Sequence, residues 1–346
     1  KAHSSSAVFF DYDRDGLLDL FLCNVGQYTH ETLRDVGRDK TDEGREGEGL
    51  GKALRFHDGM DDAFAGHLHS GRTERSVLYH NEGGGRFVDV TRETGLIDES
   101  WTGAASPIDA NNDGFIDLYV LNMQGNDEYY ENIGGKTFRK RSRELFPKTS
   151  WGAMGIKVFD FDNDGQLDLY ITDMHSDMGG DQVEFLRANA TAAHEQKKSP
   201  RPFAESILKT DDTSLFGNSF FRRTGPGKFE EISDRIGAET YWPWGISVGD
   251  LNADGYQDVF VTSSMNFPWR YHPNHVLLND AGKRFVLSEF VLGVEPRRGG
   301  RTSVPWHQLD ADGRDADHDF CEDRTGVFTM YGALGSRSSV ILDLDG

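Results

Sequence analysis

Residues 160–168 read DFDNDGQLD, and the rest of the sequence is organised around this segment. Its first, third, fifth and ninth residues are aspartates, so alternate side chains face the inside of one tight loop. Gly165 permits the left-handed turn that lets the loop close. Oxygen ligands at this density suit Ca²⁺, which takes roughly 6–8 of them. Position twelve is Ile171 instead of an acidic residue, and the flanks have strand patterns, so the sequence predicts a calcium loop inside a β-hairpin rather than an EF-hand.

The same motif occurs three more times. Residues 11–19 (DYDRDGLLD) are a full copy, whereas residues 109–117 (DANNDGFID) and 250–258 (DLNADGYQD) have Asn at the third position, which keeps an oxygen ligand and loses one charge. The seventh residue of each copy is expected to ligate through its backbone carbonyl. The predicted metal ligands are Asp11, Asp13, Asp15, Leu17, Asp19, Asp109, Asn111, Asp113, Phe115, Asp117, Asp160, Asp162, Asp164, Gln166, Asp168, Asp250, Asn252, Asp254, Tyr256 and Asp258. Copies in register predict about four structural Ca²⁺ ions.

A second hairpin is predicted after each calcium hairpin. Its pattern is an apolar or aromatic strand, a Gly-rich turn and a strand that begins at Phe. The copies are residues 78–87 (LYHNEGGGRF), 129–138 (YYENIGGKTF), 220–229 (FFRRTGPGKF) and 277–285 (LLNDAGKRF). The shortest spacing between loops, from Asp109 to Asp160, is 51 residues. Two hairpins in each such repeat predict an all-β fold, a β-propeller built from four-stranded blades.

We expect one propeller domain over residues 1–346, interrupted by two long insertions at residues 27–75 and 175–216. Each insertion follows the second strand of a repeat, so both leave from the rim opposite the calcium loops. A fifth acidic stretch at residues 309–319 is out of register with the motif and is expected to bind calcium poorly or by altered ligands. The motif begins again at Asp343, which suggests a sixth repeat and a chain that is part of a larger ring.

The chain is acidic, with a net charge of −21, and much of this charge belongs to the predicted calcium ligands. An acidic surface argues against nucleic acid or an anionic membrane as the partner. No apolar run reaches the ~18 residues of a membrane-spanning helix, so membrane insertion is not expected. Cys23 and Cys321 are the only cysteines. They are compatible with one disulfide bridge or with two buried thiols, and the sequence does not decide between them.

Together, the acidic loop and the Asn-x-Gly-x-Gly-x-Phe pattern of the second hairpin resemble FG-GAP or VCBS repeats, as in the integrin α-subunit propeller. The resemblance is closest to the ASPIC/UnbV, or cartilage-acidic-protein-like, group. It covers about half of the residues and omits the insertions. It implies Ca²⁺ at the matching positions of all four loops. It also implies a secreted, cell-surface or periplasmic adhesion module that binds a protein or glycan, within a larger extracellular assembly.

Four tryptophans precede the innermost strands of predicted repeats: Trp101, Trp151, Trp244 and Trp306. Chain direction places them on the rim opposite the calcium loops, where the insertions leave. One interpretation is an aromatic-lined site for a glycan or another flat ligand, and the other is packing between blades. The alternative function is a polysaccharide lyase or hydrolase with its active site on that rim, although no catalytic residue is identified. His67, His69 and His80 suggest either a transition-metal site or ordinary loop histidines.

Overall fold

The computed structural model describes residues 3–26, 73–123, 125–174, 213–263, 271–317 and 321–342. The two predicted insertions, residues 27–75 and 175–216, lie almost wholly outside these ranges, as do His67 and His69. Among the helices in the described ranges, none is long and apolar enough to cross a membrane.

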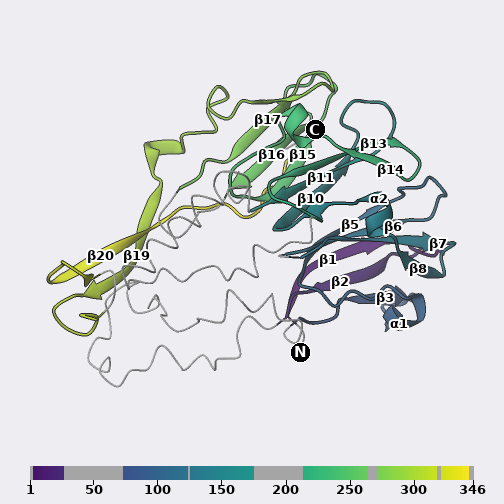
Figure 1. Ribbon diagram of the computed structural model, residues 1–346, viewed down its shortest axis with the longest axis horizontal. Helices are drawn as coiled ribbons and strands as arrows, with labels where there is room; N and C mark the ends of the chain where they lie inside the picture. Colours follow the sequence, from purple (N-terminus) through teal and green to yellow (C-terminus); the bar gives the residue numbers. More distant parts are fainter. Residues whose placement is uncertain are drawn as a thin grey trace.

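Four four-stranded antiparallel sheets make up most of the structure (Figure 1). The first contains β1 (Ser4–Phe10), β2 (Asp19–Asn24), β3 (Val77–Asn81) and β4 (Phe87–Asp89), and the second contains β5 (Thr102–Ile108), β6 (Asp117–Asn122), β7 (Glu128–Ile133) and β8 (Thr137–Lys140). The third contains β10 (Ala153–Phe159), β11 (Asp168–Asp173), β13 (Ser219–Gly225) and β14 (Lys228–Glu231), and the fourth contains β15 (Pro243–Gly249), β16 (Asp258–Ser263), β17 (His275–Asn279) and β18 (Phe285–Leu287). Within each sheet the strands pair in sequence order, so the all-β fold and the two hairpins per repeat are confirmed.

Consecutive sheets pack face against face through their first strands. β1 contacts β5, β5 contacts β10, and β10 contacts β15, and three buried apolar cores lie between the four sheets. In β6, Leu118 and Val120 join the core shared with the first sheet, whereas Tyr119 and Leu121 join the core shared with the third. Both faces of this strand are therefore buried, which explains its nearly continuous apolar sequence. The arrangement is propeller-like.

A short helix follows the last strand of each of the first three sheets: α1 (Thr91–Thr94), α2 (Ser142–Leu145) and α5 (Ser233–Ile236). Gly95 caps the C-terminus of α1. Its φ is 74°, and an added Cβ would lie 3.3 Å from the carbonyl oxygen of Phe138 in the next sheet. Gly237 stands in the same relation to Phe285. A parallel pair, β9 (Thr149–Ser150) with β12 (Ser214–Leu215), runs beside the third sheet. These connections bring each sheet close against the one before it.

The stretch expected to form a fifth repeat is a two-stranded hairpin instead of a four-stranded sheet. After the 3₁₀ helix η6 (Arg298–Gly300), β19 (Ser303–Asp310) pairs with β20 (Val327–Ala333), and the hairpin extends away from the four sheets (Figure 1). Its acidic residues bind the backbone of the hairpin itself, since Asp315 accepts the N–H of Asp310 and Asp312 accepts the N–H of Gly326, both at 2.8 Å. Cys321 in this region and Cys23 in β2 are buried free thiols.

Residues 336–342 run beside β15 after the hairpin returns. Ser247 Oγ donates to the carbonyl oxygen of Ser339 at 2.8 Å, and a Cβ added at Gly245 would lie 2.6 Å from the carbonyl oxygen of Arg337. The segment therefore takes the place beside the fourth sheet that β15 takes beside the third. Residues 343–346, where the expected sixth repeat begins, lie outside the described residues, and the number of repeats stays a prediction.

Candidate metal centres

The four acidic loops join the first and second strands of the four sheets and so lie at corresponding ends of them. The ninth residue of each loop is the first residue of the second strand. These ninth residues are only 0–1% exposed, and they are Asp19, Asp117, Asp168 and Asp258. The other loop aspartates are half-buried or exposed. Each loop thus combines one buried carboxylate with several that solvent reaches.

The second loop shows how the backbone arranges the side-chain oxygens. Asp109 accepts the N–H groups of Asp113 and Gly114 at 3.2 and 2.9 Å. Asn111 Oδ1 accepts the N–H of Asp113 at 2.9 Å, and Asp113 Oδ1 accepts the N–H of Phe115 at 2.8 Å. The first and fourth loops repeat these four hydrogen bonds. In these three loops the backbone N–H groups of the loop itself orient the predicted side-chain ligands.

The ninth carboxylate ties each loop to the third strand of its sheet. Asp117 Oδ1 accepts the N–H of Asn132 at 2.7 Å, while its Oδ2 accepts the N–H of Ala110 at 3.0 Å and the hydroxyl of Tyr129 at 2.6 Å. In the other sheets the equivalent backbone donors are Asn81, Arg223 and Asn279. The third strand, which belongs to the second hairpin, therefore fixes the position of the loop in the first hairpin.

Carboxylate oxygens of three aspartates converge in the third loop. Those of Asp160, Asp162 and Asp168 lie within 4.8 Å of one another, and the first loop has the same arrangement. Asp162 Oδ1 is buried and has no hydrogen-bond partner. An all-oxygen donor set that includes such an atom fits a hard cation such as Ca²⁺, because oxygen ligands satisfy its coordination.

Burial disfavours the charged form of the ninth carboxyl groups. It raises the pKa of Asp117 to about 6 and the pKa of Asp168 to about 7. Burial also raises the pKa values of Asp19 and Asp258. Neighbouring loop aspartates contribute to each of these increases by electrostatic repulsion. A bound cation would reverse this preference by stabilising the ionised carboxylates.

One third-strand position supplies a residue that contacts the loop in three of the four sheets, and the sequence motif did not reveal it. This residue directly precedes the backbone donor to the ninth carboxylate, and in sheet order it is His80, Glu131, Arg222 or Leu278. Three of them contact the third loop position: His80 lies 3.6 Å from Asp13, Glu131 accepts from Asn111 at 3.2 Å, and Arg222 lies 2.5 Å from Asp162. Aligning the second strand with the third strand of each sheet, so that the ninth residue meets its backbone donor, would have located this third-strand position.

The four tryptophans do not share one environment. Trp101 and Trp151 are 2% and 6% exposed, and the ring of Trp151 packs against Phe216. Trp244 is half-buried, with the guanidinium of Arg337 3.5 Å from its ring centre. The backbone of Trp306 lies within β19, outside the four sheets, and its side chain is not among the described groups. Burial of Trp101 and Trp151 favours packing between sheets, and a ligand role for the set stays a prediction.

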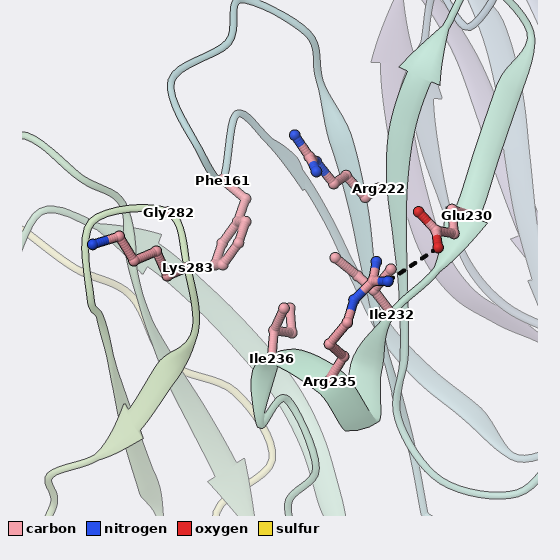
Figure 2. Close-up of a pocket in the computed structure, with 8 residues that line it drawn as sticks. All are labelled: Phe161, Arg222, Glu230, Ile232, Arg235, Ile236, Gly282 and Lys283. Carbon is pink, nitrogen blue, oxygen red and sulfur yellow. Dashed lines mark hydrogen bonds and ion pairs between the residues drawn. The ribbon is translucent and has the colours of Figure 1, made fainter.

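A shallow pocket of about 310 Å³ lies next to the third loop (Figure 2). It is lined by Phe161, Arg222, Glu230, Ile232, Arg235, Ile236, Gly282 and Lys283. Its one carboxylate, Glu230, is paired with Arg235 at 3.2 Å. This lining lacks the pair of carboxylates that glycosidic cleavage ordinarily uses. The pocket is also on the side of the loops and not on the opposite rim.

Comparison with known families identifies the repeats. The profile described as "FG-GAP-like repeat" matches residues 57–120, 109–171 and 209–261. The profile described as "FG-GAP repeat" matches residues 242–286. Together the matches run over residues 57–171 and 209–286, which is more than half of the chain.

A curated relative is the "T-cell immunomodulatory protein homolog" of Plasmodium yoelii yoelii. The two sequences are 23% identical over 257 residues. The match includes 66% of this chain and 34% of the relative, so the chain spans about a third of that protein's length.

Proposed function

Because this chain belongs to the FG-GAP repeat family, we propose that it is a calcium-stabilised β-propeller that binds a partner protein outside the cytoplasm. FG-GAP repeats suggest a protein-interaction module. The finer assignments are proposals: the ASPIC/UnbV and integrin-like affinity, the adhesive role and the extracellular, cell-surface or periplasmic location. They rest on the loop and second-hairpin patterns.

The proposal rests mainly on the similar geometry of the four acidic loops, which lie at corresponding ends of the four sheets. In the proposal, side chains at positions one, three, five and nine and the carbonyl at position seven hold one Ca²⁺ per loop. When bound, the ion neutralises carboxylates that otherwise repel one another. Extracellular modules typically bind Ca²⁺ with Kd values of roughly 10⁻⁴–10⁻³ M, and this range is the one proposed here. Binding to the folded state alone stabilises it by about 2.7 kcal/mol per site at a hundredfold excess over Kd.

A protein is the proposed ligand, with a glycan as the second candidate, and the rim opposite the loops is the proposed site. Among the described tryptophans, the half-buried Trp244, with Arg337 against its ring, supports a ligand site on this rim. The Plasmodium relative is named as a homolog of a T-cell immunomodulatory protein, and because this chain spans about a third of that relative, a comparable role here is a proposal. The acidic charge of −21 continues to argue against nucleic acid as the ligand.

The proposal is tested by measuring binding to panels of purified extracellular proteins and of glycans, with Ca²⁺ and with EDTA. Saturable, calcium-dependent binding to a protein supports it. Binding confined to glycans would redirect the proposal to carbohydrate recognition. Cleavage of a polysaccharide, measured as new reducing ends or as the absorbance of an unsaturated product, would replace it with the enzyme alternative.

A further inference from the structure

The four sheets differ in the residue at this third-strand position, and only in the third sheet is it an arginine. We propose that Arg222 acts as a tethered cation that makes the third loop the weakest calcium site of the four. The inference rests on the calcium assignment proposed above. It concerns how this chain tunes one site, and the loop motif itself does not show it, because residues 160–168 form a complete copy.

Arg222 lies directly against two predicted ligands. Its Nη2 is 2.5 Å from Asp162 Oδ2 and 3.9 Å from Asp164 Oδ2. The Asp162 side chain is 13% exposed and that of Arg222 is 39% exposed, so the contact is shielded from solvent on the carboxylate side. Figure 2 shows the Arg222 side chain on its strand beside the loop that carries Phe161. Arginine side chains are cations in proteins, so this contact places a positive charge against the loop.

The contact coincides with a change in the loop. In the first, second and fourth loops, the third residue accepts the N–H of the fifth residue at 3.3, 2.9 and 3.0 Å. In the third loop, Asp162 Oδ1 has no hydrogen-bond partner, and Arg222 holds the other oxygen. The third loop therefore has an ion pair between Asp162 and Arg222 where the other three loops have a hydrogen bond from the fifth N–H to the third side chain.

A divalent cation at the third loop has to share Asp162 with this guanidinium or displace it. Sharing places like charges a few ångströms apart in a partly buried site, where repulsion is stronger than in water. Displacement loses the ion pair with Asp162. Either route lowers the affinity for Ca²⁺. The ion pair between Arg222 and Asp162 also reduces repulsion among the four aspartates of the third loop when no metal is bound.

The other sheets supply the comparison. Leu278 of the fourth sheet occupies the same position without charge, and the fourth loop keeps its hydrogen bonds. Glu131 adds an acid beside the second loop and is itself paired with Arg141 at 2.7 Å. His80 lies 3.0 Å from Asp19 and 3.6 Å from Asp13. Arg222 and Leu278 occupy equivalent positions, so reciprocal substitutions at these two residues test the effect of the charge.

The test follows the backbone amides of the four loop glycines, Gly16, Gly114, Gly165 and Gly255, by ¹H–¹⁵N NMR during a Ca²⁺ titration. In the wild type, Gly165 should respond at a Ca²⁺ concentration at least about tenfold higher than the other three. Arg222→Leu should bring Gly165 into their range. Leu278→Arg should shift the response of Gly255 to higher concentration. Arg222→Gln, which removes the charge and keeps much of the side-chain length, gives the same prediction as Arg222→Leu if the leucine variant fails to fold.

The outcomes separate the two proposals. If Gly165 titrates together with the other glycines and neither Arg222 variant changes its midpoint, the tethered-cation inference is wrong and the calcium assignment stands. If none of the four glycines responds to millimolar Ca²⁺, the calcium assignment itself is wrong. A lower Gly165 affinity that persists in both Arg222 variants would also overturn the role given to Arg222.

Discussion

The side-chain amide of Asn132 in the second sheet donates to the carbonyl oxygen of Tyr12 in the first acidic loop at 2.8 Å. Asn279 of the fourth sheet makes the same bond to Phe161 of the third loop, also at 2.8 Å. In the third sheet, Arg223 replaces the asparagine and donates to Ala110 of the second loop at 2.7 Å. The second residue of each of these loops is thus hydrogen-bonded to the sheet that follows, so a cation bound in a loop would also affect packing between sheets.

Replacing Asn132 with Ala should destabilise the fold by about 1–3 kcal/mol, because one buried and one partly buried carbonyl group lose their donor. These are the carbonyls of Tyr12 and Ile116. The measurement is the free energy of unfolding by urea in excess Ca²⁺. Asn81→Ala is the matched control, since among the described residues Asn81 Nδ2 donates only within its own sheet, to Leu18. Equal losses in the two variants would contradict the role given to the bond between sheets.

The turn that carries Gly135 also lies tightly against the first loop. A Cβ added at Gly135 would meet Asp13 Cα and the Phe115 ring, both at 3.0 Å, whereas at Gly134 nothing lies within 4 Å. Both glycines have positive φ, 72° and 63°, so Gly134→Ala reports the backbone strain alone. Gly135→Ala should cost at least about 1 kcal/mol more than Gly134→Ala in the free energy of unfolding. Indistinguishable variants would show that the sheets can separate there without cost.

Stability should depend on the protonation of Glu239. Burial, with repulsion from Asp234 and Asp173, raises its pKa to about 8. Between its unfolded pKa and about 8 the folded chain therefore binds more protons than the unfolded chain, so the contribution of Glu239 to stability falls as pH rises through this window. Glu239→Gln should gain stability relative to the wild type as pH rises toward 8. Melting temperatures across this range measure the effect, and the exposed Glu230→Gln is the control; a difference that does not vary with pH would contradict it.

The two best-described tryptophans allow packing and ligand roles to be separated. The Trp151 side chain is 6% exposed, so Trp151→Ala should lower the free energy of unfolding by about 3–5 kcal/mol. Trp244→Ala should cost less, because its ring is half-buried, and should weaken binding once a partner is identified. A Trp244 variant that binds the partner with unchanged affinity would remove this ring from the proposed site.

The local patterns predicted the four loops and both hairpins of each repeat because the aspartate and glycine spacings specify the turns directly. The same logic expected a fifth repeat around residues 309–319, where the structure has a two-stranded hairpin. In its acidic turn, Asp312 and Asp315 accept backbone N–H groups of the hairpin, and Asp315 also pairs with Arg314. Arg222 was missed because its contact with Asp162 depends on pairing between two hairpins that are distant in sequence. The burial of Trp101 likewise depends on how consecutive sheets pack.

Calcium content and thermal stability, measured together on the purified chain, test the central claim most directly. After equilibration in about 1 mM Ca²⁺, a range that suits extracellular sites, the account predicts Ca²⁺ in at least the first, second and fourth loops and a melting temperature that falls when EDTA is added. A chain that retains no Ca²⁺ and melts at the same temperature in EDTA would contradict it.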